Sequence, residues 1–210
     1  MDGSKEACED VESAEDSSAS KTLPSIHVSP LLSVGGNDNL GLPNDSDDEE
    51  NEDHSPPVCK NGVLDLSRRA LTSIDRKHRK VYGNVRKLII SANKFHNVTG
   101  LDMFRNCVLV DATDNQIQKL SSFLPLAGQL RSLFLSNNGV KNVDNLRSFV
   151  NLETLDLSCN SIEDISNALD NHRLAWIDLS SNALTSLPDL SKLTSLKHLN
   201  VSSNRISSFK

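Results

Sequence analysis

The sequence predicts an α/β solenoid, in which short parallel strands form a curved sheet on the concave side and short helices, 3-10 turns and loops form the convex side. Three observations predict this fold. An asparagine recurs every 22 or 23 residues, an apolar frame of fixed spacing surrounds each one, and residues 1–57 lack both features. The series is Asn93, Asn115, Asn138, Asn160, Asn182 and Asn204. A fixed period of this length indicates repeats that stack only on their neighbours.

The apolar frame has the spacing Leu-x-x-Leu-x-Leu-x-x-Asn-x-Leu. Leu130–Val140 fills it once, and Leu152–Ile162 fills it again 22 residues later. Because side chains alternate along a strand, the two apolar residues of Leu-x-Leu share one face, which is expected to point into the core. The frame is that of leucine-rich repeats, and stacking is obligatory because one repeat cannot bury its own apolar face.

The recurring asparagine is expected to connect neighbouring coils. Its amide can both donate and accept hydrogen bonds, so it can pair with buried backbone groups at the turn after each strand. Each such group would cost about 1–3 kcal/mol if it were left unpaired.

The first coil departs from the frame. Residues 58–84 contain the strand pattern Leu64-Asp-Leu66 but have Arg69 at the asparagine position. We therefore expect an N-terminal capping coil in which Arg69 faces solvent because no strand precedes it. One degenerate and six regular strands are expected in total.

Charge divides the chain near residue 57. Residues 1–57 hold 15 Asp/Glu against two Lys/Arg, whereas residues 58–210 hold 13 Asp/Glu against 20 Lys/Arg. The first segment has too few apolar residues to offset its chain entropy, so a disordered acidic tail is predicted. Residues 58–210 are long enough for one leucine-rich repeat domain.

The C-terminal end of this domain lacks a predicted cap, because the last repeat ends at Phe209-Lys210. Repeat arrays normally need polar capping units at both ends. Either the chain is a fragment or isoform of a longer protein, or a partner covers the exposed edge. Apart from that edge, a monomer is expected.

The expected compartment is the cytosol, with the nucleus as an alternative. The first residues have neither a basic region nor an apolar run, and no stretch is long enough to span a membrane. The cysteines Cys8, Cys59, Cys107 and Cys159 are scattered rather than paired, which favours a reducing environment. Cys107 occupies a core position of the frame and is predicted to be a buried thiol.

The apolar spacing of Leu135–Leu152 resembles the intracellular class of 22-residue leucine-rich repeats typified by the regulatory subunit of protein phosphatase 1. The resemblance covers about residues 61–209, and that subunit also has an acidic tail. The Ile-Glu-x-Leu run that typically follows each strand in that subunit is missing from this sequence, and Val143-Asp-Asn-Leu146 is the nearest match. The resemblance implies a solenoid and a function among phosphatase regulators, ciliary and centrosomal proteins, splicing factors and trafficking scaffolds.

Position within the frame predicts a binding face. The third and fifth residues of each frame point out of the strand, away from the core. The candidate partner-binding residues at these positions, with the apolar ones expected to be exposed, are Ile89, Leu109, Asp111, Phe134, Asp156, Trp176, Asp178 and His198. Aromatic anchors with a polar surround are typical of binding hot spots. The competing interpretation of the aspartates is that Leu-Asp-Leu-Ser is merely the common filling of such repeats.

A basic cluster in and after the first coil is a second candidate surface. It comprises Arg68, Arg69, Arg76, Lys77, Arg79, Lys80, Arg86 and Lys87. It could dock the acidic tail, an acidic partner or an anionic membrane, or act as a nuclear localisation signal; the alternative is a solvated capping face. Nucleic acid is not an expected partner, because the aromatic residues do not interleave with the basic ones.

The remaining motifs favour an interaction protein without a cofactor. Ser29, Ser46 and Ser55 lie in proline-directed or acidic contexts and are candidate phosphorylation sites. The histidines show no metal-ligand spacing, and no phosphate-binding loop or nucleophile motif occurs. We therefore predict a non-enzymatic scaffold or adaptor that binds a protein on its concave face. The alternatives are an N-terminal targeting or regulatory module of a larger signalling, trafficking or cytoskeletal protein, and a phosphatase regulatory subunit.

Overall fold

The computed structural model describes residues 57–165, 169–187 and 189–209. The chain divides into Met1–Asn51 and Glu52–Lys210, and every described residue belongs to the second unit. Most of the predicted acidic tail, with Cys8 and the candidate phosphorylation sites Ser29, Ser46 and Ser55, therefore lies outside the described residues.

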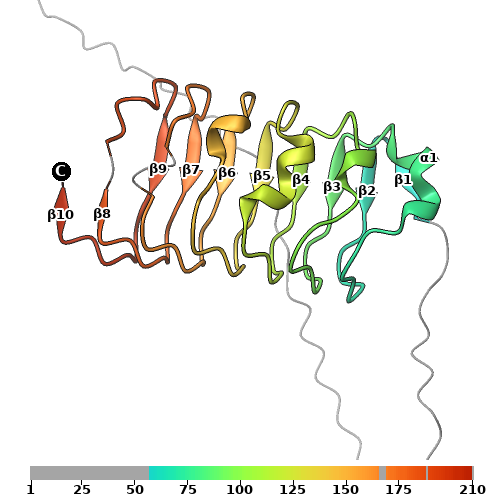
Figure 1. Ribbon diagram of the computed structural model, residues 1–210, viewed down its shortest axis with the longest axis horizontal. Coiled ribbons are helices and arrows are strands. Elements are labelled where there is room, and N and C mark those ends of the chain that lie inside the picture. Colours follow the sequence, from blue (N-terminus) through green and yellow to red (C-terminus); the bar gives the residue numbers. More distant parts are fainter. Residues whose placement is uncertain (1–56, 166–168, 188, 210) are drawn as a thin grey trace, which may run out of the picture. The chain divides into compact units, whose positions relative to one another are not determined.

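Seven parallel three-residue strands form the body of one sheet, in the order of the chain (Figure 1). They are β2 (Val63–Asp65), β3 (Lys87–Ile89), β4 (Leu109–Asp111), β5 (Ser132–Phe134), β6 (Thr154–Asp156), β7 (Trp176–Asp178) and β9 (His198–Asn200). From β2 to β7 the middle residue of each strand is buried, whereas its two neighbours are more exposed. The predicted leucine-rich repeat solenoid is thus confirmed, and the outward surface of its sheet is the concave face.

An eighth strand was not expected. β1 (Cys59–Lys60) pairs antiparallel with β2, so a strand does precede the first degenerate repeat. The connecting Asn61 and Gly62 have φ angles of 52° and 75°. Positive φ at both central residues is what a type I′ hairpin turn requires, and Asn-Gly is the pair that adopts it most readily. Arg69 is nevertheless exposed, as expected.

The other side of the solenoid contains short helical segments. They are η1 (Arg76–His78), α1 (Arg79–Tyr82), η2 (Leu101–Met103), η3 (Leu120–Leu126) and η4 (Leu146–Ser148). In the last coils β8 (Ser186–Leu187) and β10 (Ser208–Phe209) form a separate parallel pair. Isolated bridges join Lys119 to Asn142 and Asn142 to Asp164, and all these positions follow a repeat asparagine by four residues. A second, weaker ladder therefore runs beside the main sheet.

The core is a continuous column of apolar side chains between these two sides. Its largest fully buried members include Phe95, Phe104, Phe123 and Phe149, and the ring of Tyr82 stacks on Phe104 with centroids 4.8 Å apart. Cys107 is fully buried, as predicted. In the last described coil the frame residues are only partly buried: Leu196, Leu199, Val201 and Ile206.

The asparagine ladder has the predicted role, which Asn160 illustrates. Its Oδ1 accepts a hydrogen bond from the backbone N–H of Val140 (2.9 Å). Its Nδ2 donates to the carbonyl oxygens of Leu135 in the previous coil (2.9 Å) and of Leu157 and Ser158 in its own (3.1 and 3.0 Å). Asn93, Asn115, Asn138, Asn182 and Asn204 also each join two coils. Each asparagine thus satisfies backbone groups that stacking would otherwise leave unpaired.

The residue before each repeat asparagine adopts a left-handed backbone conformation. These residues are Ala92, Asp114, Asn137, Cys159, Ser181 and Ser203, with φ between 53° and 55°. Only one of them is asparagine, and none is glycine, although these two residues tolerate this region best. The tight turn after each strand is therefore enforced by the stacked coils and their asparagines rather than by local sequence preference.

Candidate protein-binding face

Two columns of side chains run across the concave face, because the parallel strands pair in register. In one column Trp176 of β7 pairs with Thr154 and with His198. In the other, Phe134 of β5 pairs with Asp111 and with Asp156. Ile89 and Leu109 continue the two columns on β3 and β4. The structure therefore places all eight candidate partner-binding residues on one surface.

The apolar members of this face are less accessible than the sequence suggested. Ile89, Leu109, Phe134 and Trp176 are half-buried rather than exposed. Neighbouring strands lie only about 4.8 Å apart, so side chains of adjacent columns cover part of each ring or aliphatic chain. His198 is exposed. A partner would thus meet partly covered apolar groups set among polar ones.

The aspartates of the face first serve the turn at the end of their own strands. Asp156 Oδ1 accepts hydrogen bonds from the backbone N–H and the Oγ of Ser158, at 2.9 and 2.7 Å. Asp178 makes the same pair of bonds with Ser180. Asn200 replaces the aspartate in the last strand and holds Ser202 in the same way. This geometry supports the structural interpretation of the Leu-Asp-Leu-Ser pattern.

The hydrogen-bonding role of the serines that follow these residues was not predicted from the sequence. Serine or threonine follows each of these acidic or amide residues by two positions, which is the spacing of a local side-chain turn. Ser136 and Ser158 also hydrogen-bond to each other through their hydroxyl oxygens at 2.8 Å. The spacing was visible in the sequence, and the Asx-turn rule would have identified it.

The electrostatics of the face are those of crowded carboxylates. Burial raises the pKa of Asp156, the hydrogen bonds from Ser158 oppose this, and the charges of Asp178 and Asp111 raise it further. The ion pairs between described residues all lie elsewhere, and none includes these three aspartates. The second carboxylate oxygen of Asp178 accepts from Asn200 Nδ2 at 2.9 Å. The row thus carries negative charge that no described Lys or Arg neutralises by direct contact.

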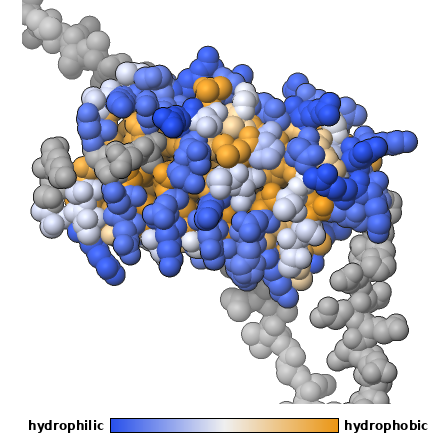
Figure 2. Space-filling view, in the orientation of Figure 1, coloured by the Kyte–Doolittle hydropathy of each residue, from blue (hydrophilic) through white to orange (hydrophobic). Residues whose placement is uncertain are grey.

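The basic cluster is divided by the fold and does not form one compact patch. Arg68 and Arg69 follow the C-terminal end of β2, and residues 76–80 lie in η1 and α1 on the helical side. Arg86 directly precedes β3, and Lys87 is its first residue. Arg76 pairs with Asp102 at 3.0 Å, and Lys77 pairs with Asp75 at 3.5 Å. All eight residues still belong to the N-terminal end of the solenoid, where Figure 2 shows mainly hydrophilic side chains.

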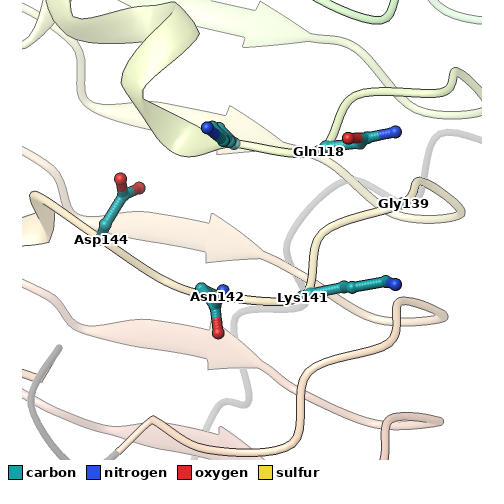
Figure 3. A pocket seen from close by; sticks show the side chains of 6 residues that line it. Gln118, Gly139, Lys141, Asn142 and Asp144 are labelled. Atoms are coloured by element: carbon teal, nitrogen blue, oxygen red, sulfur yellow. The ribbon is translucent and has the colours of Figure 1, made fainter.

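A surface hollow lies between two successive coils, away from the concave columns (Figure 3). It is lined by Gln118, Lys119, Gly139, Lys141, Asn142 and Asp144, and the side chains of Gln118 and Lys141 extend in parallel from neighbouring coils. All of these residues except Gly139 are exposed, whereas small-molecule sites are mostly apolar and enclosed. Within the described ranges, no group of three or more His, Cys, Asp or Glu side chains could hold a metal ion. The described residues also include no helix long and apolar enough to cross a membrane.

The repeats match a known family model. Residues 129–171 and 172–210 each fit the model described as leucine-rich repeats in two copies. Residues 129–210 of this chain therefore consist of leucine-rich repeats. No curated protein sequence matches the chain.

Two solved structures show the same architecture in other leucine-rich repeat proteins. One is an internalin, InlF, from Listeria monocytogenes, with a TM-score of 0.55 and 22% identity over 62% of this chain and 38% of the internalin. The other is the functional domain of InlJ from Listeria monocytogenes, with a TM-score of 0.55 and 20% identity over 70% of this chain and 36% of that one. The chain thus spans little more than a third of each, and at this identity the likeness concerns the fold alone. Leucine-rich repeat folds are typically non-catalytic and generally bind proteins.

Proposed function

We propose that this leucine-rich repeat protein is a non-enzymatic scaffold or adaptor that binds a protein partner on its concave face. One observation carries the proposal. Phe134 and Trp176 lie on the same face of the sheet, on strands separated only by β6, and Asp156 of β6 lies between their strands. Neither aromatic residue occupies an inward-facing position, so stacking of the repeats does not explain either ring.

The chemistry of the face specifies the chemistry of the partner. Half-buried aromatic rings offer apolar contact area, and the carboxylates beside them lack a described cationic partner. A helix or extended segment with apolar anchors and nearby Lys or Arg would complement both features. Asp111, Asp156 and Asp178 are half-buried rather than enclosed in the core, so a partner cation could approach without opening the fold.

The test is a pull-down from cell extract with the full chain and two matched double variants. Trp176→Ala with Phe134→Ala removes both aromatic anchors, and losses of about 2 kcal/mol or more of binding are common at such positions. Leu124→Ala with Val150→Ala removes two exposed apolar side chains from the helical side instead. The proposal expects the first variant to lose its partners and the second to retain them. If the first variant folds normally and keeps every wild-type partner, the concave face is not the binding surface.

Charge can be separated from the turn geometry in the same assay. Asn200 shows that an amide holds the following serine as a carboxylate does. Asp156→Asn with Asp178→Asn should therefore keep the turns and remove two charges. Steering by those charges predicts a slower association rate that depends less on salt, with a smaller change in dissociation. Unchanged association kinetics would restrict the aspartates to their structural role.

The proposal extends to the repeat class and compartment. The 22-residue period supports the intracellular class typified by the phosphatase 1 regulatory subunit, and the scattered cysteines support a reducing compartment, the cytosol or nucleus. Among the described residues, Cys59, Cys107 and Cys159 form no disulfide. Fractionation of cells that express the full chain tests the compartment directly.

A further inference from the structure

The net positive charge of the repeat region lies entirely in residues 58–87, which comprise the first coil and the start of the next. Residues 58–87 hold nine Lys/Arg and two Asp/Glu, whereas residues 88–210 hold eleven of each. A surface that serves solubility alone intersperses charges of both signs. The first coil therefore produces a local positive field, although the whole chain has a formal net charge of −6.

The fold gathers these charges at one end of the solenoid. β1 and α1 both lie at the end opposite the C-terminus (Figure 1). Lys60 of β1 pairs with Val63, and the Arg86 backbone N–H donates to the Gly62 carbonyl oxygen at 2.7 Å. The basic residues thus surround the N-terminal end of the sheet from several elements.

Internal pairing leaves most of these charges available. Arg76 and Lys77 have carboxylate partners within 4.0 Å. Lys60, Arg79, Lys80 and Arg86 are exposed, and none of them takes part in an ion pair between described residues. Arg68 and Arg69, on the other rim of the same coil, are likewise exposed and outside those ion pairs.

Exposed apolar side chains accompany the free cations. Val58, next to β1, is 65% exposed, and Val81 of α1 is 38% exposed. They are two of the four large hydrophobic side chains that are exposed in the described part of the chain. Apolar groups beside unpaired cations suit a lipid interface, where the cations meet anionic headgroups and the apolar groups enter the boundary with the acyl chains.

We propose that the N-terminal end of the solenoid docks on an anionic lipid bilayer as a peripheral contact, separately from the concave face. A bilayer fits this end better than an acidic protein does. The exposed cations outside the described ion pairs are spread over several elements of the solenoid end, and the exposed Val58 and Val81 lie on those elements or next to them. A fluid surface of anionic headgroups needs no shape complementarity, whereas a protein partner usually does.

Co-sedimentation of the full chain with vesicles tests this proposal. Vesicles of phosphatidylcholine alone are compared with vesicles in which part of the lipid is phosphatidylserine. The wild type should bind only the latter at about 0.05 M salt and dissociate at about 1 M, where screening shortens the Debye length to about 3 Å. Each basic residue near such a surface contributes about fivefold to partitioning. Arg79→Glu with Lys80→Glu should therefore weaken binding at least about 20-fold.

The matched control is Lys119→Glu with Lys141→Glu, which makes the same change in net charge at exposed sites of later coils. It should keep most of the vesicle binding. Val58→Ser with Val81→Ser should weaken vesicle binding. The loss should be largest at higher salt, where the charges are screened and the apolar contacts account for more of the remaining binding. Three results would each overturn the proposal: no wild-type binding to phosphatidylserine vesicles at low salt, equal losses in the two charge variants, or capture by soluble poly-glutamate without any vesicle binding. The last would assign the end to an acidic polypeptide.

Discussion

Each repeat asparagine joins its own coil to the preceding one through its side-chain amide. Asn160 makes four hydrogen bonds to backbone atoms of two coils, and the described buried side-chain nitrogen and oxygen atoms all have partners. The half-buried amide of Asn160 is costly to lose because its removal leaves several backbone groups without partners at once. The ladder is therefore a condition of stacking.

Asn160→Ala should lower the free energy of unfolding by about 1–3 kcal/mol, because it leaves buried backbone groups without partners. Urea unfolding measures the change. Asn97→Ala is the control, since Asn97 is exposed and makes no described side-chain hydrogen bond. A midpoint and slope equal to those of the wild type in the Asn160 variant would contradict the ladder's role.

Asp156 should make stability depend on pH in an unusual direction. Burial first, and then the neighbouring Asp178 and Asp111, raise its pKa, so the folded chain retains a proton at a pH where the unfolded chain has released it. The cost of ionising Asp156 is thus fully present at neutral pH and is relieved as pH falls through the folded-state pKa. Asp156→Asn should be more stable than the wild type at neutral pH, with an advantage that shrinks as pH falls through the raised folded-state pKa of Asp156.

Two further variants serve as controls for the pH dependence of the Asp156→Asn variant. Asp156→Ala also removes the charge but loses the acceptor for Ser158, so it should be less stable than the Asn variant by about 1 kcal/mol. Asp189 is the opposite case, because hydrogen bonds from Ser191 lower its pKa. Asp189→Asn should therefore lose stability relative to the wild type above the ordinary pKa of aspartate and converge with it below. Equal pH profiles for Asp156→Asn and Asp189→Asn would refute this assignment.

At the scale of elements, the N-terminal hairpin begins the sheet and depends on its turn. Gly62 has φ +75°, where a Cβ is strained whatever space surrounds it. Gly62→Ala should destabilise the protein by about 1–2 kcal/mol. Gly83→Ala is the matched control: its φ is −61° and no atom lies within 4 Å of the added Cβ, so it should be neutral or slightly stabilising. Thermal unfolding compares the two, and equal losses would contradict the turn assignment.

Some of these structural elements could be predicted from the sequence and others could not. The frame of Leu-x-Leu residues predicted the strands and the inward and outward faces, because alternation along a strand is a local property. β1 was missed because its two residues carry no repeat pattern, although Asn61-Gly62 was a usable hairpin signal. The left-handed residue before each repeat asparagine was invisible, since Ala92 and Ser181 have no preference for that conformation and tertiary contacts impose it.

The same limits apply to the candidate face. Columns and neighbours followed from the period, so Trp176 and Phe134 were placed correctly. Their half-burial did not follow, because it depends on how side chains of adjacent strands lean over one another. The basic residues lie close together in the sequence and were expected to form one cluster. The fold instead distributes them over the turn after β2, the helical segments η1 and α1, and the start of β3. This happens because a coil returns to the sheet only after crossing the helical side.

At the scale of the whole molecule, the solenoid presents two chemically distinct surfaces. The concave face carries aromatic rings among carboxylates, and the N-terminal end carries exposed cations that lie outside the ion pairs between described residues, together with the exposed Val58 and Val81. A chain that bound a protein on one surface and a lipid bilayer on the other would act as an adaptor. We expect the protein partner to contact the concave face.

Site-specific photo-cross-linking tests that claim most directly. A photo-reactive phenylalanine analogue replaces Phe134 in the full chain, and in a second sample it replaces Leu124 on the helical side. The replacement of Phe134 conserves an aromatic ring and captures the bound protein whatever its identity. We expect discrete cross-linked protein products from position 134 and none from position 124. Products from position 124 alone, with none from position 134, would contradict this expectation.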